Sequence, residues 1–124
     1  MKEQAQVKIL LVDDDQDMCS SLSDVLSFET GYKVLYSTVP MEALEILKKE
    51  EFSLVIIDYK MPEMNGLELL NKIKSIRPGQ KVFMLTAFIS TELIEQAKKA
   101  GADEVLSKFI WPDEILKLVS KTIS

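Results

Sequence analysis

Short apolar runs of strand length alternate with helical patterns along this chain, and this alternation limits the fold more than any other feature. Val7–Val12, Leu54–Ile57 and Val82–Leu85 are the most apolar runs, as expected for parallel strands that helices cover on both faces. Lys33–Tyr36 and Glu104–Ser107 are more mixed, which suits strands at the edges of a sheet. The pattern therefore predicts five strands.

Between these runs, apolar residues recur at the spacing of one helix face. Repeated strand–helix units with short links favour a parallel sheet with right-handed crossovers. We therefore predict an α/β fold: a doubly wound (βα)5 three-layer sandwich around a parallel five-stranded sheet. The strand order does not follow from the pattern alone, but the flavodoxin-like order 2-1-3-4-5 needs only five strands, and we expect that order. The predicted helix faces are Met18, Leu22, Val25 and Leu26; Leu44 and Leu47; Leu67, Leu70 and Ile73; Leu93 and Ala97; and Ile115, Val119 and Ile123.

Length and composition limit the classes of function. A chain of 124 residues, 47% hydrophobic, suits one globular domain, and we expect a loose segment over residues 1–6 and one domain over residues 7–124. The net charge of −5 argues against direct binding of nucleic acid or of an anionic membrane. No signal peptide or membrane span is recognisable, so we expect a cytoplasmic location.

The absence of histidine and the presence of only one cysteine also exclude several kinds of catalytic and metal-binding site. Without histidine, the chain has no Ser-His or Cys-His catalytic pair, no histidine metal ligand and no phosphohistidine of its own. Cys19 is the only cysteine, so no disulfide can form within the chain. In a helical pattern, such a residue is expected to be a small buried hydrophobe.

Four small polar sites follow four of the predicted strands. The first strand ends in Asp13-Asp14-Asp15, and Asp58, Thr86 and Lys108 follow three others. Because parallel strands end at the same edge of a sheet, these sites fall where open α/β sheets bind ligands. Carboxylates, a hydroxyl and a lysine gathered at this edge indicate a divalent cation and a phosphoryl group.

The acidic cluster has a simple alternative explanation in helix capping. Acids near a helix N-terminus are favoured by the helix dipole and by free N–H groups, which accounts for Asp15 or Asp17. It does not account for Asp13-Asp14 directly behind a buried strand, where like charges repel each other. A hard cation such as Mg²⁺, which prefers oxygen ligands, resolves that conflict. Four acids at this turn would repel the bare phosphate of a nucleotide-binding loop, and no Walker A motif is present.

Asp58 is the candidate nucleophile. An Asp at a strand end is usually a turn or capping residue, but here it follows a strand beside the one that ends in Asp13-Asp14. A carboxylate can attack phosphorus to form an aspartyl phosphate while a bound cation offsets the repulsion between the anions. Thr86 could then donate a hydrogen bond to the transferred group, and Lys108 could pair with it as a point charge.

The chain resembles a receiver domain of two-component response regulators, from Val7 to its C-terminus. The resemblance rests on the order and spacing of several motifs together, each weak alone. They are Val12-Asp13-Asp14, Asp58, Met61-Pro62-x-Met64-Asn65-Gly66, Thr86-Ala87, Ala100-Gly101-Ala102-Asp103 and Lys108.

The resemblance implies a role for each matching residue. Asp58 would be the phosphoacceptor, and Mg²⁺, or Mn²⁺ as a substitute, would be held by Asp13, Asp14, Asp58 and the backbone carbonyl of Lys60. The phosphoryl group would be bound by the side chains of Thr86 and Lys108 and the backbone of Ala87. The donor would be a histidine kinase or phosphotransfer protein, with small acyl phosphates as substitutes. Downstream protein partners or an output domain would recognise the phosphorylated state. Formation of a homodimer on phosphorylation is a further possibility that the resemblance leaves open.

Two positions depart from the family pattern. The family usually has proline, joined by a cis peptide, where Phe109 follows Lys108. A cis bond before a residue other than proline costs about 2.5–4 kcal/mol, so we predict a trans peptide and some displacement of Lys108. The family often has an aromatic residue at the position of Val105, and its absence predicts weaker or differently routed signalling.

Two residues flank the site in positions that set the lifetime of the phosphoryl group in the family. Lys60 lies two residues after Asp58, and Phe88 two residues after Thr86. A cation and a bulky ring should both hinder an attacking water, which predicts slow self-dephosphorylation. The alternative is that both side chains simply face solvent. Trp111 follows in the loop after Lys108 and should lie near the same rim.

Three functional interpretations remain open at this level. The first is a phosphorylatable switch that catalyses only its own phosphorylation and dephosphorylation and is no enzyme towards an external substrate. The second is a degenerate receiver that acts as a constitutive protein-binding module, to which the departures at Val105 and Phe109 point. The third, the least favoured, is a small Mg²⁺-dependent phosphatase, which would require multiple turnover.

Overall fold

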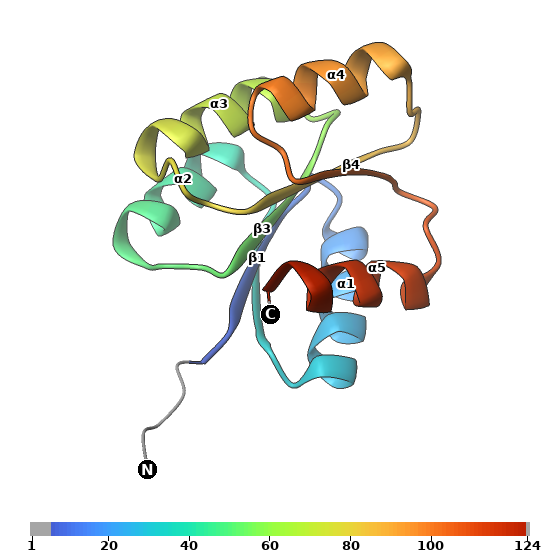
Figure 1. Cartoon of the computed structure of the whole chain (residues 1–124). Helices are drawn as coiled ribbons and strands as arrows, with labels where there is room; N and C mark the ends of the chain where they lie inside the picture. The colour runs from blue at the N-terminus through green and yellow to red at the C-terminus, as the bar shows by residue number, and fades with distance from the viewer. Residues whose placement is uncertain (1–5, 124) are drawn as a thin grey trace.

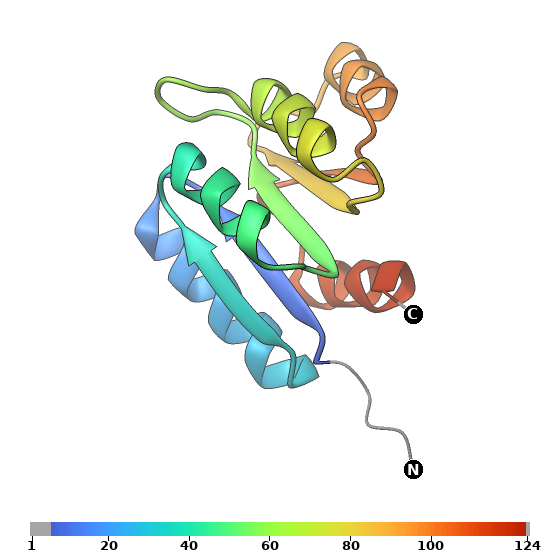
Figure 2. The same cartoon turned by 90° about the vertical axis from the view of Figure 1, so that its left-hand side faces the viewer.

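The computed structural model of the chain describes residues 6–123, and within them five strands alternate with five helices. Figures 1 and 2 show the sheet between two helical layers. The elements are β1 (Lys8–Val12), α1 (Gln16–Thr30), β2 (Lys33–Ser37), α2 (Pro40–Lys49), β3 (Leu54–Asp58), α3 (Gly66–Ile76), β4 (Val82–Thr86), α4 (Thr91–Lys99), β5 (Glu104–Ser107) and α5 (Pro112–Ile123).

The sheet is parallel with the strand order β2-β1-β3-β4-β5, which confirms the predicted fold class. The mixed strands lie at the edges and the most apolar strand, β3, lies at the centre. β1 begins at Lys8 instead of Val7. β3 and β4 each extend one residue further than predicted, because Asp58 still pairs with Leu85 and Thr86 with Ser107. Of the predicted loose segment, residues 1–5 lie outside the described range; Gln6 is exposed and precedes β1.

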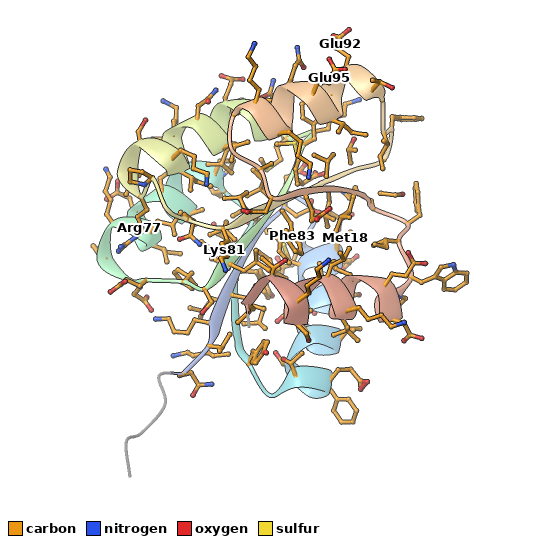
Figure 3. All side chains as sticks on the ribbon, viewed as in Figure 1. Met18, Arg77, Lys81, Phe83, Glu92 and Glu95 are labelled. Atoms are coloured by element: carbon orange, nitrogen blue, oxygen red, sulfur yellow. The ribbon has the colours of Figure 1, made fainter. Side chains whose placement is uncertain are left out.

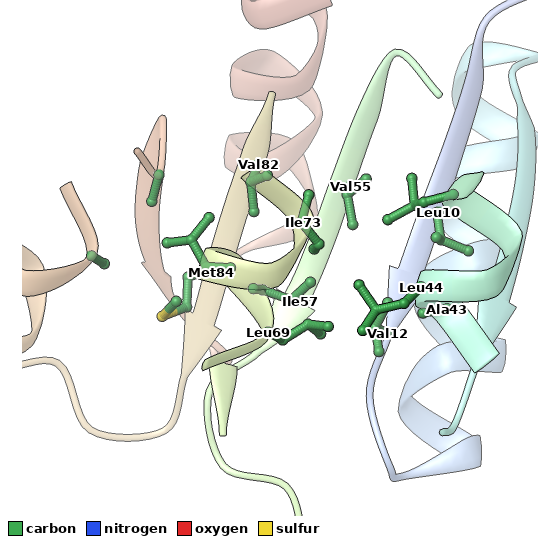
Figure 4. Packing of buried hydrophobic residues seen from close by; sticks show 14 of the residues in the cluster. Leu10, Val12, Ala43, Leu44, Val55, Ile57, Leu69, Ile73, Val82 and Met84 are labelled. Atoms are coloured by element: carbon green, nitrogen blue, oxygen red, sulfur yellow. The ribbon is translucent and has the colours of Figure 1, made fainter. Parts of the chain in front are cut away.

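Alternate residues of the strands enter two separate cores, because successive side chains of a strand point to opposite faces. Leu10, Val12, Val55, Ile57, Val82 and Met84 pack against α2, α3 and α4, as Figure 4 shows. Ile9, Leu11, Leu54, Ile56, Phe83 and Leu85 pack against α1 and α5. Helices therefore exclude water from both faces of the sheet, which explains why the sequences of the central strands are continuous apolar runs.

Helix ends follow local sequence signals. Asp15 caps α1 by accepting hydrogen bonds from the backbone N–H groups of Asp17 and Met18, so the capping interpretation holds for Asp15. Gly31 ends α1 with φ 75°, a left-handed conformation that glycine adopts without steric cost.

In Figure 3, Glu92 and Glu95 project from the exposed side of α4, while Phe83 lies on the α5 side of the sheet.

The edge of the sheet away from the four polar sites is tied together by side chains. Arg77, which follows α3, donates hydrogen bonds to the backbone carbonyls of Leu47 and Glu50. The buried amide of Gln80 bonds the carbonyls of Phe52 and Lys81. No helix within residues 6–123 is long and apolar enough to cross a membrane.

Candidate functional site

The ends of four strands bring the predicted polar residues together at one edge of the sheet. Asp13 follows β1, Asp58 ends β3, Thr86 ends β4 and Lys108 follows β5. The exposed fractions of Asp13, Asp58 and Thr86 are 7%, 3% and 4%. Parallel pairing brings the C-terminal ends of these strands together. Buried polar groups therefore gather at the C-terminal edge of an otherwise apolar sheet.

Three carboxylates and one ammonium form the centre of the site. One carboxylate oxygen from each of Asp13, Asp14 and Asp58 lies within 4.8 Å of the other two. The Lys108 Nζ lies 3.2 Å from Asp13 Oδ2 and 3.3 Å from Asp58 Oδ1. Clustered carboxylate oxygens are the ligands that Mg²⁺ prefers, so the donor set fits a divalent cation.

Burial and the close approach of these charged groups shift the pKa values of Asp58 and Lys108. Burial, and then the charge of Asp13, raise the pKa of Asp58 to about 6, against the lowering effect of Lys108. Burial alone would lower the pKa of Lys108, but Asp13 and Asp58 outweigh it and the pKa is raised. Near pH 7.5, Lys108 is therefore a cation, and Asp58 is an ionised carboxylate that the fold disfavours.

Asp13 is held in place from several directions. Its backbone N–H bonds the carbonyl of Ser37, and its Oδ1 accepts a hydrogen bond from the backbone N–H of Asp15. The Cys19 thiol donates to its backbone carbonyl at 3.2 Å. Cys19 is 1% exposed, as predicted, and burial and the nearby Asp13 raise its pKa to about 11, so it remains a protonated donor. The contact with Asp13 was not predicted, because residues six apart show no such pairing in the sequence.

The loop from β3 to α3 packs tightly behind Asp58. A Cβ on Gly66 would lie 2.8 Å from the Asp58 carbonyl oxygen and from the Tyr59 Cα, so only glycine allows α3 to begin here. Asn65 caps α3 and forms a capping box with Glu68, which the Asn-x-x-Glu spacing could have revealed. Glu63, in the same loop, has φ 69°. Lys60 is exposed.

The hydroxyl of Thr86 takes part in a local turn. Its Oγ1 accepts a hydrogen bond from the Phe88 backbone N–H at 3.2 Å and donates one to the Phe88 carbonyl at 3.3 Å. Phe88 itself is 85% exposed. Val105 is half-buried and packs against the core under α2, α3 and α4. The site thus lacks an aromatic side chain at position 105, as the sequence indicates.

The peptide bond that follows Lys108 has the predicted geometry. The structure has no cis peptide bond within residues 6–123, so the Lys108–Phe109 bond is trans, as predicted. The displacement of Lys108 stays a prediction, and its ammonium lies within reach of two carboxylates. The long, flexible stem of lysine can make up for a change in the backbone. Phe109 and Trp111 are 78% and 73% exposed.

An apolar rim surrounds the charged centre. Eight large hydrophobic residues are exposed within residues 6–123, and six of them lie in the loops or the first helical turn at this edge of the sheet. Sequence reasoning identified only part of this rim, because exposed and buried apolar residues look alike in a pattern. The six are Val39, Met41, Phe88, Ile89, Phe109 and Trp111.

Comparison with known proteins agrees with this geometry. The family model of the response regulator receiver domain matches residues 9–120. The chain is 35% identical to sporulation initiation phosphotransferase F of Bacillus subtilis, over 92% of this chain and 91% of that protein. It is also 35% identical to the transcriptional regulatory protein ZraR of Klebsiella oxytoca, over 96% of this chain but only 27% of that protein.

A solved structure gives the same result for the fold. The crystal structure of a response regulator receiver domain protein (CheY-like) from Methanospirillum hungatei superimposes with a TM-score of 0.90 at 35% identity, covering 96% of this chain and 94% of that one. The family match, the relatives and the strand order all agree. This chain belongs to the receiver-domain family of two-component response regulators.

Proposed function

We propose that this receiver domain is a phosphoacceptor switch that takes a phosphoryl group onto Asp58 from the phosphohistidine of a histidine kinase or phosphotransfer protein. The observation that carries the proposal is the buried Asp58 carboxylate, which lies between two further carboxylates and the Lys108 ammonium. No histidine is present in this sequence, so the donor histidine would lie outside these 124 residues.

In the proposed reaction, a carboxylate oxygen of Asp58 attacks phosphorus, and the P–N bond to the donor imidazole breaks. The nitrogen keeps the electron pair of that bond and takes up a proton. Because the pKa of Asp58 is about 6, this carboxylate is ionised and nucleophilic at pH 7.5. Burial strips water from it, which raises its energy before the attack and favours transfer.

The proposed metal ligands are Asp13, Asp14, Asp58 and the backbone carbonyl of Lys60. When bound there, Mg²⁺ or Mn²⁺ would supply charge that offsets the repulsion between the carboxylate and the phosphoryl group. Asp13 supports this assignment best, because its backbone and its Oδ1 are already fixed by hydrogen bonds. Its Oδ2 is shared with Lys108.

Three further groups would bind the phosphoryl oxygens: the Lys108 ammonium, the Thr86 hydroxyl and the Ala87 backbone N–H. Lys108 already lies 3.3 Å from an oxygen of Asp58, so a phosphoryl group added to that residue would remain close to it. Lys60 and Phe88 are both exposed near the site. We propose that they slow the approach of water and so lengthen the lifetime of the aspartyl phosphate.

The switch unit in this proposal is residues 7–124, located in the cytoplasm. Phosphorylation would shift a two-state equilibrium, and a downstream protein or output domain would bind the favoured state. A homodimer formed on phosphorylation is one form such a readout could take. The domain would turn over no external substrate.

The test is incubation with Mg²⁺ and acetyl phosphate, followed by measurement of the intact mass. One added phosphoryl group is expected in the unaltered chain and none in Asp58→Asn or without Mg²⁺. Asp24→Asn, which changes an exposed acid of α1, is the matched control and should still be labelled. No adduct and no Mg²⁺ binding would favour a constitutive binding module, and steady release of phosphate from a phosphomonoester would favour a phosphatase.

A further inference from the structure

The outer surfaces of α2 and α3 form a groove. Both helices cover the same face of the sheet and pack into the same core, and Figures 1 and 2 show them side by side. A hollow of about 350 Å³ lies between them, and a hollow of about 250 Å³ adjoins it at the start of α2, where Met41 lines both. We name the two hollows together the α2–α3 groove. Its apolar lining is Val39, Pro40, Met41, Leu44, Met64 and Ile76.

The apolar lining of this groove is open to water. The exposed fractions of Val39 and Met41 are 43% and 55%, and Met64 and Ile76 are half-buried. The unbranched methionine side chains can adapt to the shape of whatever covers them. An amphipathic helix fits a hollow between two helices, because its row of apolar side chains fills the groove. α2 has 10 residues and is about 15 Å long, so about three turns of such a helix would cover the groove.

Opposite charges stand toward the two ends of the groove. Lys48 and Lys72 line it from the C-terminal halves of α2 and α3, and Glu63 lines it at the start of α2. The Lys48 Nζ is paired with Glu45 Oε2 at 3.0 Å. Within residues 6–123, the side chains of Lys72 and Glu63 have neither a hydrogen-bond partner nor an ion-pair partner. The groove therefore carries an unpaired cation toward one end and an unpaired anion at the other.

The order of these charges selects the direction of a bound helix. α2 and α3 each follow a parallel strand, so both run from the edge of the sheet that carries Asp58 toward the opposite edge. Acidic residues stabilise the first turn of a helix and basic residues its last turn. Laid antiparallel to α2 and α3, a helix with these charges brings its acids to Lys72 and its bases to Glu63. Laid parallel, it brings like charges together at both ends.

We propose that the α2–α3 groove binds an amphipathic helix of a partner protein, antiparallel to α2 and α3, with acidic residues in its first turns and basic residues in its last. A second copy of this chain fits less well, because it would present another hollow instead of a ridge. The net charge of −5 also makes copies repel one another. The proposal does not rest on phosphorylation of Asp58, because no carboxylate of that centre lines the groove.

The test uses two synthetic helices and the unphosphorylated protein without metal. Each peptide has about 15 residues, the length at which an isolated helix begins to be stable, with leucines along one face and a staple that keeps it helical. The first has glutamates in its N-terminal half and lysines in its C-terminal half, and the second has these charges exchanged. Fluorescence anisotropy of the labelled peptides measures the affinity. The first peptide should bind about tenfold more tightly, since two attractive exposed pairs replace two repulsive ones.

Exchanging the charges of the groove should exchange this preference. The double variant Lys72→Glu/Glu63→Lys keeps the net charge and should bind the second peptide about tenfold more tightly than the first. Met41→Asp, which places a charge in the apolar lining, should weaken the binding of both peptides by about tenfold or more. Phe28→Asp changes an apolar residue of α1 that is 87% exposed. It is the matched control and should bind as the unaltered chain does.

Several outcomes would overturn the proposal. They are equal affinity for the two peptides, a preference that the double variant does not reverse, binding that survives Met41→Asp, and no binding of either peptide. Sedimentation of the protein alone tests the other occupant. A dimer that Met41→Asp abolishes would assign the groove to a second copy and would also overturn the proposal.

Discussion

Replacing Asp58 by asparagine should stabilise the metal-free protein, although it removes the central residue of the site. The carboxyl group is 3% exposed, and burial and Asp13 raise its pKa from 3.8 to about 6. Folding therefore favours the protonated form of this group. Asparagine has nearly the same shape, does not ionise and adds no negative charge beside Asp13.

The size of the effect follows from the raised pKa. A group with a raised pKa contributes stability that is fully present below pH 3.8 and is lost as the pH rises through about 6. The difference of about two pKa units corresponds to about 3 kcal/mol at pH 7.5. This difference already includes the favourable contact between Lys108 and the Asp58 carboxylate, and in the variant Lys108 keeps Asp13 at 3.2 Å. We therefore expect a net gain of about 1–3 kcal/mol at pH 7.5, falling to about 1 kcal/mol or less at pH 4.5.

Urea unfolding followed by far-UV circular dichroism, from pH 4.5 to 7.5 in the presence of a chelator, measures this difference. Asp24→Asn changes the net charge equally at an exposed position and corrects for long-range repulsion. The reasoning is refuted if Asp58→Asn is no more stable than Asp24→Asn at pH 7.5, or if its advantage does not shrink at low pH. Saturating Mg²⁺ should also reduce the advantage, because the variant has lost one proposed ligand.

Three further predictions concern the loops and the metal. Gly66→Ala should destabilise the fold by about 1–3 kcal/mol, because the added Cβ would lie 2.8 Å from the Asp58 carbonyl oxygen; an unchanged urea midpoint would contradict this. Glu63→Gly should raise the unfolding free energy by up to about 1 kcal/mol, since Glu63 has φ 69° and left-handed backbone costs a side chain about that much; a lower midpoint would show that the side chain has a role of its own. Mg²⁺ at a hundred times its Kd should stabilise the unaltered protein by about 2.7 kcal/mol, and it should stabilise Asp14→Asn much less. Thermal unfolding with and without Mg²⁺ measures this difference. Asp17→Asn, which changes an exposed acid of the same turn, is the control.

Much of the fold and the composition of the site could be predicted from the sequence, because both depend on where apolar runs stop. Asp58 and Thr86 end strands that are buried on both faces. Parallel pairing of these strands then places both residues at the same edge of the sheet. Any chain with this alternation would bring the ends of its strands to one edge. That is why the sequence alone groups the acidic residues, the threonine and the lysine.

The details that position these groups could not be predicted, because they depend on the path of loops. The Thr86 hydroxyl bonds to Phe88 two residues ahead, a choice that a strand-end threonine does not reveal. Glu63 has a positive φ without the glycine or asparagine that usually signals one. The contact of Lys108 with two carboxylates depends on the three-dimensional position of a long side chain, which the change from proline to Phe109 does not reveal.

The apolar rim around the site has a consequence for handling the protein in solution. At neutral pH, the net charge of −5 makes copies repel one another and opposes contact through exposed apolar side chains. Near the isoelectric point of about 4.8 this repulsion disappears, while Phe88, Phe109 and Trp111 remain in water. Colloidal association at that pH should therefore occur through the edge of the sheet that carries Asp58, and this edge should be the first surface to be buried in an acid precipitate.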